Sequence, residues 1–127
     1  MNFTEQIATY LQANGVGTLA TDLFISYLPE DSHLPCVGVF DTGGIQPDKY
    51  LPMKHPTFQV FIRAASFDAG KTKLAAIRAL LHQKMNSTLV VGEDYFFYIF
   101  ALSEGGHIGR NDAGMDEFTM NFEALIR

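Results

Sequence analysis

Eight consecutive apolar residues at positions 95–102, Tyr-Phe-Phe-Tyr-Ile-Phe-Ala-Leu, constrain the fold of this chain more than any other segment. The run is rich in aromatic residues, which favour strands, and it is too short for a typical buried helix. A strand of this kind is apolar on both faces, so one layer of helices covers only half of it. Several exposed rings would make a larger apolar patch than monomers usually tolerate. The second face therefore needs a cover, either a neighbouring subunit or the proline-rich segment at 41–56 folded back on its own sheet.

Two segments show the spacing of amphipathic helices. Residues 3–13 place their apolar side chains on one face, with Asn2 and Glu5 spaced as a capping box and Asn14-Gly15 as a stop. Residues 66–84 predict a longer helix, with Ser66 as its N-cap and its basic residues outside the apolar stripe. That stripe consists of Leu74, Ile77 and Leu81.

Four further segments are typical of strands. Residues 57–64 and 118–126 alternate between apolar and polar side chains, as half-buried strands do. Residues 23–28 and 36–40 are short apolar runs bounded by Asp or Pro, and we expect them to pair as a hairpin.

The order of these elements predicts an α+β fold, an antiparallel-rich mixed sheet with two helices packed on one face. All five prolines lie between residues 29 and 56, and residues 41–56 show neither helical nor strand periodicity. Long structureless connections are uncommon in compact domains and often functional, so we expect an extended arm at 41–56, either reaching a partner or lying as a surface loop. The whole chain, 1–127, is expected to form a single domain.

Charge and cysteine content narrow the functional classes. The formal net charge is −5, which disfavours direct nucleic-acid binding because a protein surface that binds the phosphate backbone needs an excess of Lys and Arg. Cys36 is the single cysteine, so an intrachain disulfide is excluded. The sequence shows neither a signal peptide nor an 18-residue apolar run, so we expect folding in the cytoplasm and no membrane contact.

Residues 65–72 resemble a phosphate-binding loop placed between a strand and a helix. The segment reads Ala-Ser-Phe-Asp-Ala-Gly-Lys-Thr, a relaxed Walker A pattern. A phosphate cradle needs flexible residues with inward N–H groups, whereas this loop carries bulky Phe67 and anionic Asp68. Asp68 would repel phosphate but suits the positive end of a helix. We therefore interpret the segment as a capped helix start.

A second catalytic pattern is Val-Phe-Asp-Thr-Gly at 39–43 with His-Ile-Gly-Arg-Asn at 107–111, which resembles retroviral-type aspartic proteases. In a homodimer two copies of Asp41 could share a proton and activate water. The long helix, Gly44 after the motif and Asp112 after Gly-Arg-Asn all depart from that family. Asp-Thr-Gly-Gly is also a good turn sequence, so the protease stays a minor alternative.

No metal or nucleophile site can be assembled from local sequence. The histidines, His33, His55, His82 and His107, share no metal-ligand spacing, and His82 is expected to face the negative end of the long helix. Cys36 lies in an apolar strand and is read as a core residue. We therefore expect no catalytic, cofactor-binding or metal-binding residues, no cofactor and no enzymatic activity.

Several short sequence segments, in the same order along the chain, resemble one known family. They are Thr-Asp-Leu-Phe at 21–24, the segment Pro-Cys-Val-Gly-Val-Phe-Asp-Thr-Gly-Gly at 35–44, Pro-Thr-Phe-Gln-Val-Phe-Ile-Arg at 56–63, Gly-Arg-Asn-Asp at 109–112 and Phe-Thr-Met-Asn-Phe at 118–122. Together they are similar to the minor capsid or tail terminator proteins of long-tailed bacteriophages and prophages. The match spans most of the chain.

That resemblance implies a structural virion protein without catalysis, assembled in the bacterial cytoplasm. Its subunits would form a ring, commonly a hexamer, that caps the tail tube and joins it to the head connector or stopper protein. Acidic subunits would repel the DNA phosphates, so DNA would pass through the lumen of the ring without binding to it. We expect contacts from the arm at 41–56 and the loop at 104–116. Another neck or connector protein of the same virion remains the alternative.

Overall fold

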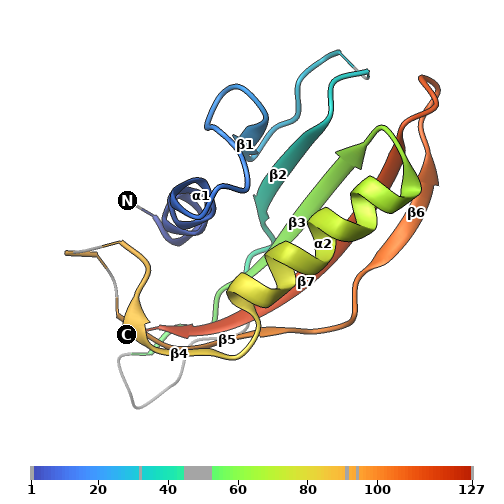
Figure 1. The fold of residues 1–127 in the computed structure, drawn as a ribbon. Helices are drawn as coiled ribbons and strands as arrows, with labels where there is room; N and C mark the ends of the chain where they lie inside the picture. Colours follow the sequence, from blue (N-terminus) through green and yellow to red (C-terminus); the bar gives the residue numbers. More distant parts are fainter. Residues whose placement is uncertain (1, 32, 45–52, 91, 94, 127) are drawn as a thin grey trace.

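The computed structural model describes residues 2–31, 33–44, 53–90, 92–93 and 95–126. Its elements are α1 (Phe3–Ala13), β1 (Leu23–Ile25), β2 (Cys36–Asp41), β3 (Thr57–Ala64), α2 (Phe67–Leu81), β4 (Lys84–Thr88), β5 (Tyr95–Ala101), β6 (Gly106–Arg110) and β7 (Asp116–Ile126). α2 lies along β3 and β7, and α1 packs beside β1 and β2 (Figure 1). The predicted α+β class, a mixed sheet with two helices, is confirmed.

β7 is the central strand of the sheet. The strand order is β1-β2-β3-β7-β5-β4, and β6 also pairs with β7. β3 runs antiparallel along one edge of β7, while β5 pairs with the C-terminal half of its other edge and β6 with the N-terminal half. β5 and β6 thus follow one another along the same side of β7, separated only by a short loop.

The predicted hairpin of 23–28 with 36–40 is wrong. β1 and β2 pair in parallel, with Leu23 opposite Val37 and Ile25 opposite Val39. Parallel strands cannot be joined by a tight turn, so the connection at 26–35 has to cross over. β1 ends at Ile25 because Ser26 takes a positive φ of 64°. The antiparallel partner of β2 is β3.

The sequence patterns did not predict β4 or β6, and they placed the end of the long helix too late. β4 reads Lys-Met-Asn-Ser-Thr and, among the strands that the structure describes, pairs only with β5, so it is an edge strand that needs no apolar alternation. β6 lies within the segment that was read as a loop. α2 ends at Leu81 rather than at 84, because His82 closes it in an extended conformation and Gln83 takes φ 61°. β7 begins at Asp116, two residues before the predicted start.

One apolar core lies between the helices and the sheet. The capping box is confirmed, since Glu5 N donates to Asn2 Oδ1 at 2.8 Å, and so is the Ser66 cap, which accepts from Ala69 N at 3.1 Å. The inward residues of both helices and of one sheet face form a single cluster. Its largest fully buried members are Phe58, Phe96, Phe118, Phe122, Ile7, Leu11, Leu23, Ile62, Ile77, Leu81, Ile99 and Met120.

The ends of the predicted arm are held at the sheet. Residues 45–52 lie outside the described part of the chain, so only residues 41–44 and 53–56 of the arm predicted at 41–56 are described here. Thr42 N donates to Thr57 O at 3.1 Å. Lys54 and Ile126 exchange two backbone hydrogen bonds, of 2.9 and 3.0 Å. β2 and β3 are therefore extended beyond their ends toward the terminus of β7.

Candidate interaction surface

The sheet face turned away from the helices carries an apolar area on β4, β5 and β7. Tyr98 and Phe100 pair with Leu125 and Glu123, while Ile99 between them faces the core. Leu102 continues this alternation by donating its N–H to Asn121 O at 2.8 Å. Met85 on β4 lies opposite Tyr98. We call the resulting set the outer patch: Met85, Tyr98, Phe100, Leu102 and Leu125.

Exposure shows that the outer patch is incompletely covered. Met85 is 52% exposed and Leu102 is 55% exposed, whereas the other members are partly buried. The rings of Tyr98 and Phe100 pack on each other with centroids 4.9 Å apart. Both helices lie on the opposite face, in the core cluster. The two-faced strand expected at 95–102 is present, and its second face is the one left open.

Glu123 supplies the polar anchor of the outer patch. Its Oε1 accepts a hydrogen bond from the Tyr98 hydroxyl at 2.9 Å. Burial, together with this bond and the negative charge of Glu123, raises the pKa of the Tyr98 hydroxyl. Tyr98 is thus a fixed, neutral aromatic side chain over the physiological pH range.

The chain itself covers the other end of the same sheet face. A Cβ on Gly38 would come within 2.8 Å of Leu28 Cδ2 and 2.7 Å of the Phe40 ring, so both side chains lie over β2 at this position. Arg63 donates from its Nη1 to Asp31 O at 3.2 Å, and its Nε lies 3.6 Å from Glu117 Oε2. Arg63 is consequently only 8% exposed. The crossover that replaces the predicted hairpin therefore serves as a cover, and it stops short of the outer patch.

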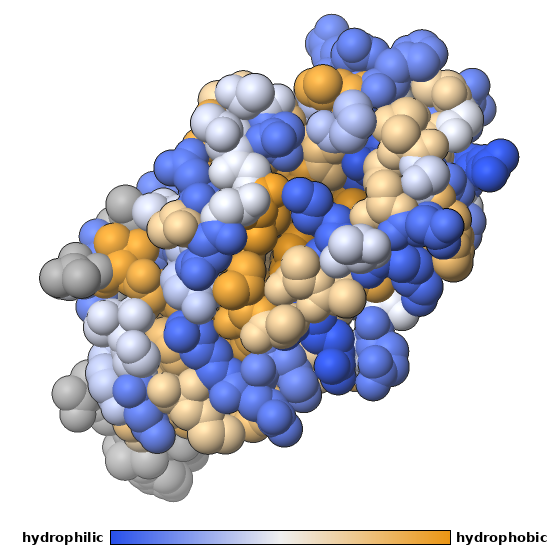
Figure 2. Space-filling view, in the orientation of Figure 1, coloured by the Kyte–Doolittle hydropathy of each residue, from blue (hydrophilic) through white to orange (hydrophobic). Residues whose placement is uncertain are grey.

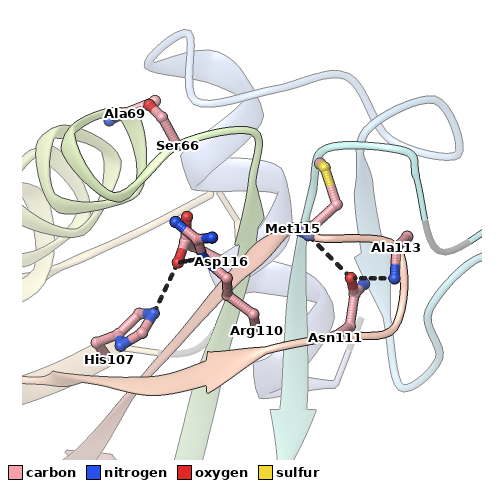
Figure 3. A network of polar contacts seen from close by, with 8 residues as sticks. All are labelled: Ser66, Ala69, His107, Arg110, Asn111, Ala113, Met115 and Asp116. Atoms are coloured by element: carbon pink, nitrogen blue, oxygen red, sulfur yellow. Dashed lines mark hydrogen bonds and ion pairs between the residues drawn. The ribbon is translucent and has the colours of Figure 1, made fainter.

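The predicted contact loop at 104–116 is largely an ordered hairpin formed by β6 and β7. Asp116 is buried, and its Oδ1 lies 2.9 Å from His107 Nε2 and accepts from Arg110 Nε at 3.2 Å (Figure 3). Burial by itself would raise the pKa of the Asp116 carboxyl, but the hydrogen bonds and positive charges of these partners outweigh it and lower that pKa. The ring of His107 also packs edge-on against Phe67 and Phe118, which joins the hairpin to α2 and the core.

The turn of this hairpin is organised by Asn111. Its Oδ1 accepts from Ala113 N at 3.0 Å and from Met115 N at 2.9 Å (Figure 3). Gly114 takes the left-handed conformation, with φ 80°, that closes the turn. Ile108 lies at a register shift in β6 and is 58% exposed. The Gly-Arg-Asn segment that resembled a protease motif thus holds a turn and presents an exposed apolar side chain beside it.

Both segments that resemble catalytic motifs are engaged in local structure within the subunit. Asp41 ends β2, and its Oδ1 accepts from Gly43 N at 2.7 Å, as expected of a turn residue. In the segment resembling a phosphate loop, Gly70 is already helical and packs against the ring of Phe118. Lys71 Nζ lies 5.8 Å from the centroid of the Phe67 ring. The segment is a capped helix start, and its N–H groups do not surround an anion site.

The histidines and Cys36 are dispersed. Within the described ranges, His, Cys, Asp and Glu form no group of three or more suited to a metal ion. His82 differs from the expectation, because its Nδ1 accepts from Ala101 N at 3.0 Å and so caps the edge of β5 rather than the helix end. Cys36 is buried, and burial raises the pKa of its thiol against the lowering effect of the Arg63 charge. Neither described helix is long and apolar enough to cross a bilayer.

The helix side of the molecule has an open hollow between the segment that follows α1 and the first turns of α2. Figure 2 shows apolar residues on its floor between more polar rims. Its volume is about 240 Å³, and Lys73 spans it by donating from Nζ to Val16 O at 2.8 Å. The lining is mostly apolar, with Asp22, Arg63 and Lys73 as its charged members. Each of these charged side chains is already engaged within the subunit, Asp22 with Thr18 N, Arg63 with Asp31 O and Lys73 with Val16 O, so we assign no ligand to the hollow.

Sequence reasoning identified part of the outer patch and missed the rest. Tyr98, Phe100 and Leu102 come from the apolar run, but Met85 was missed because β4 lacks a strand pattern. The sequence did contain a sign that Leu125 belongs to this surface, since it is the apolar residue among the otherwise polar outward side chains of β7.

The burial of Asp116 in the β6–β7 hairpin could not be predicted from the sequence, because a carboxylate at the end of a predicted loop is ordinarily solvated.

Comparisons with known proteins agree with this geometry. The family described as bacteriophage tail terminator protein matches residues 10–127. A chain from a structure described as the virion of a native gene transfer agent particle has the same fold, with a TM-score of 0.69 at 19% identity, covering 99% of this chain and 98% of that one. The curated proteins contain no match. Since the family match spans nearly the whole chain, this protein belongs to the bacteriophage tail terminator family and is a structural component of the virion.

Proposed function

We propose that this protein is a ring-forming subunit that caps the phage or prophage tail tube and joins the tail to the head, without catalysis. The ring is a homo-oligomer, with six subunits as the expected number. Its partners are the tail tube protein on one side and the head connector or stopper protein on the other. Assembly takes place in the cytoplasm of the bacterial host.

The outer patch is the observation that carries this proposal. Aromatic and aliphatic side chains on one open sheet face favour burial against protein, since each square ångström of apolar surface removed from water contributes roughly 25 cal/mol. Leu102 and Met85 are each more than half exposed in the isolated subunit. A large apolar area of this kind is typical of a protein-protein contact.

The β6–β7 hairpin and the net charge support the same function. Asp116 and Asn111 hold the hairpin in one conformation, so a partner binds it without a large ordering cost. Asp41 and the 65–72 segment are engaged in local structure, which supports a role without catalysis. With a net charge of −5, a ring of such subunits would repel DNA passing through its lumen.

Binding to tube ends tests the function directly. We expect purified protein, mixed with tubes polymerised from the tube protein of the same phage, to appear by electron microscopy as a ring on one end of each tube. Tubes capped in this way should stop growing when more tube protein is added. Protein that leaves tube ends bare and growth unchanged, but binds the isolated head connector, would instead place the subunit at another joint of the neck.

A further inference from the structure

We propose that, within the assembly, the outer face of α2 in one copy covers the outer patch of the next copy. This inference rests on the self-association proposed above and adds which two surfaces meet. The contact joins the helix layer of one subunit to the open sheet face of its neighbour. Each copy then contributes two different surfaces to two different neighbours.

The composition of the open face suits a subunit contact. Its two rings are already partly buried, so each can bury only the rest of the roughly 150 to 250 Å² of an aromatic side chain, and Met85, Leu102 and Leu125 add aliphatic area around them. Together these side chains form the apolar centre of an interface, which a polar rim around them would complete. Leu28 and the backbone of Asp31 already cover the opposite end of the face, so one further element would complete its burial.

Charge favours α2 as that element. Among the charged residues of α2, Asp68 is the single acid, against Lys71, Lys73 and Arg78. Lys73 is bound to Val16 O and Arg78 lies 3.4 Å from Glu104, whereas Lys71 is exposed. The sheet face has the opposite character, because Arg63 is buried against Glu117 and Glu123 borders the outer patch.

The outward side of α2 also fits the outer patch in shape. Its exposed residues include Thr72, Ala75, Ala76 and Ala79, at the spacing of one helical stripe. These short, mostly apolar side chains leave room for the rings of Tyr98 and Phe100. Large side chains on the sheet would thus meet small ones on the helix, the arrangement that fills space best.

The alternative pairing of two open faces is disfavoured. It would place Glu123 of one copy beside Glu123 of the other, and like charges in an apolar contact are costly. A face-to-face pair is also closed by a two-fold axis and stops at a dimer. A helix-on-sheet contact is heterologous and can continue from copy to copy until a ring closes.

Disulfide trapping distinguishes these arrangements. In the variant Ala76→Cys with Leu102→Cys, oxidation of the assembled protein should yield a ladder of covalent oligomers on a non-reducing gel. The matched control replaces Ala13, an exposed residue of α1, in place of Ala76, and we expect no ladder from it. Covalent dimers from Leu102→Cys alone would show face-to-face pairing and overturn the inference.

A charge exchange gives an independent measurement. Lys71→Glu and Glu123→Lys should each weaken self-association by roughly tenfold, and the double variant should recover most of that loss. Ala13→Glu adds a negative charge on the exposed side of α1, away from both surfaces, and should leave association unchanged.

The outcomes separate the inference from the function on which it rests. If rings form on tube ends but neither the ladder nor the charge rescue is seen, the α2 contact is wrong and the ring function stands. If no variant, nor the wild type, associates with itself or with tubes, the proposed function fails as well.

Discussion

His107 and Asp116 lie across the β6–β7 hairpin with Nε2 2.9 Å from Oδ1, and the same carboxylate oxygen accepts from Arg110 Nε. One buried carboxylate thus fixes two side chains of the neighbouring strand. The hairpin projects beside the start of α2 and carries the exposed Ile108 (Figure 1). Its conformation in the free subunit therefore depends on the charge of Asp116.

Acid should weaken the fold through this group. Because the pKa of Asp116 is lowered from its ordinary value of 3.8, its contribution to stability is complete above that value and is lost as the pH falls below it. The free energy of unfolding of Asp116→Asn should therefore vary less steeply with pH below about 4 than that of the wild type. Urea titrations at a series of pH values measure both slopes, and equal slopes would contradict the role given to Asp116.

Gly70 should tolerate no side chain. A Cβ at this position would overlap the ring of Phe118, a fully buried residue. Although alanine favours a helix by about 1 kcal/mol over glycine, we expect Gly70→Ala to lose roughly 1 to 3 kcal/mol net because the core is overpacked. Gly106→Ala is the matched control, since its Cβ meets nothing within 4 Å. Chemical denaturation compares the two, and equal stabilities would show that α2 can shift without cost.

Asp41→Asn should leave the protein without a detectable functional change. The carboxylate of Asp41 is exposed and accepts from Gly43 N within its own turn, a role that the asparagine side-chain oxygen can keep. We expect no peptide cleavage at mildly acidic pH from either protein, and the same binding to tube ends. Cleavage by the wild type that disappears in Asp41→Asn would restore the protease alternative.

The elements predicted best are those that bury one face, because one-sided burial produces a periodic pattern of apolar residues in the sequence. α1, α2, β3 and β7 each bury one face, and the alternating or helical spacing of their apolar residues follows from that. β4 and β6 are different, because an edge strand that leaves most of its side chains in water needs no apolar pattern. The parallel pairing of β1 and β2 was unpredictable for another reason. Apolar residues such as Leu23 and Val37 indicate that a strand is buried, but not whether it runs parallel or antiparallel to its neighbour.

The candidate surface follows the same division. Tyr98 and Phe100 were accessible to sequence reasoning because a continuous apolar run implies two buried faces. The sequence could not predict which end of the second face stays open. That depends on Leu28 and Asp31, which the crossover brings over β2 and β3. Local sequence predicted the structure of the two motif-like segments, a helix cap at Ser66 and a turn at Asp41.

Disrupting the outer patch should separate folding from assembly. Leu102→Lys places a charge on a residue that is 55% exposed, so the isolated subunit should keep its stability within about 0.5 kcal/mol. Buried against a neighbour, the same charge would be unpaired and costly, so assembly should be lost. Thermal denaturation checks the first expectation, and Ala13→Lys on the exposed side of α1 serves as the control.

The most direct measurement is the mass of the assembly in solution, for the wild type and for Leu102→Lys, with and without tail tubes. We expect the wild type to reach a closed ring of defined mass, at high concentration or on tube ends, and the variant to remain a folded monomer. A wild type that stays monomeric under all these conditions, or a Leu102→Lys variant that assembles as well as the wild type, would contradict the proposal that the outer patch joins the subunits.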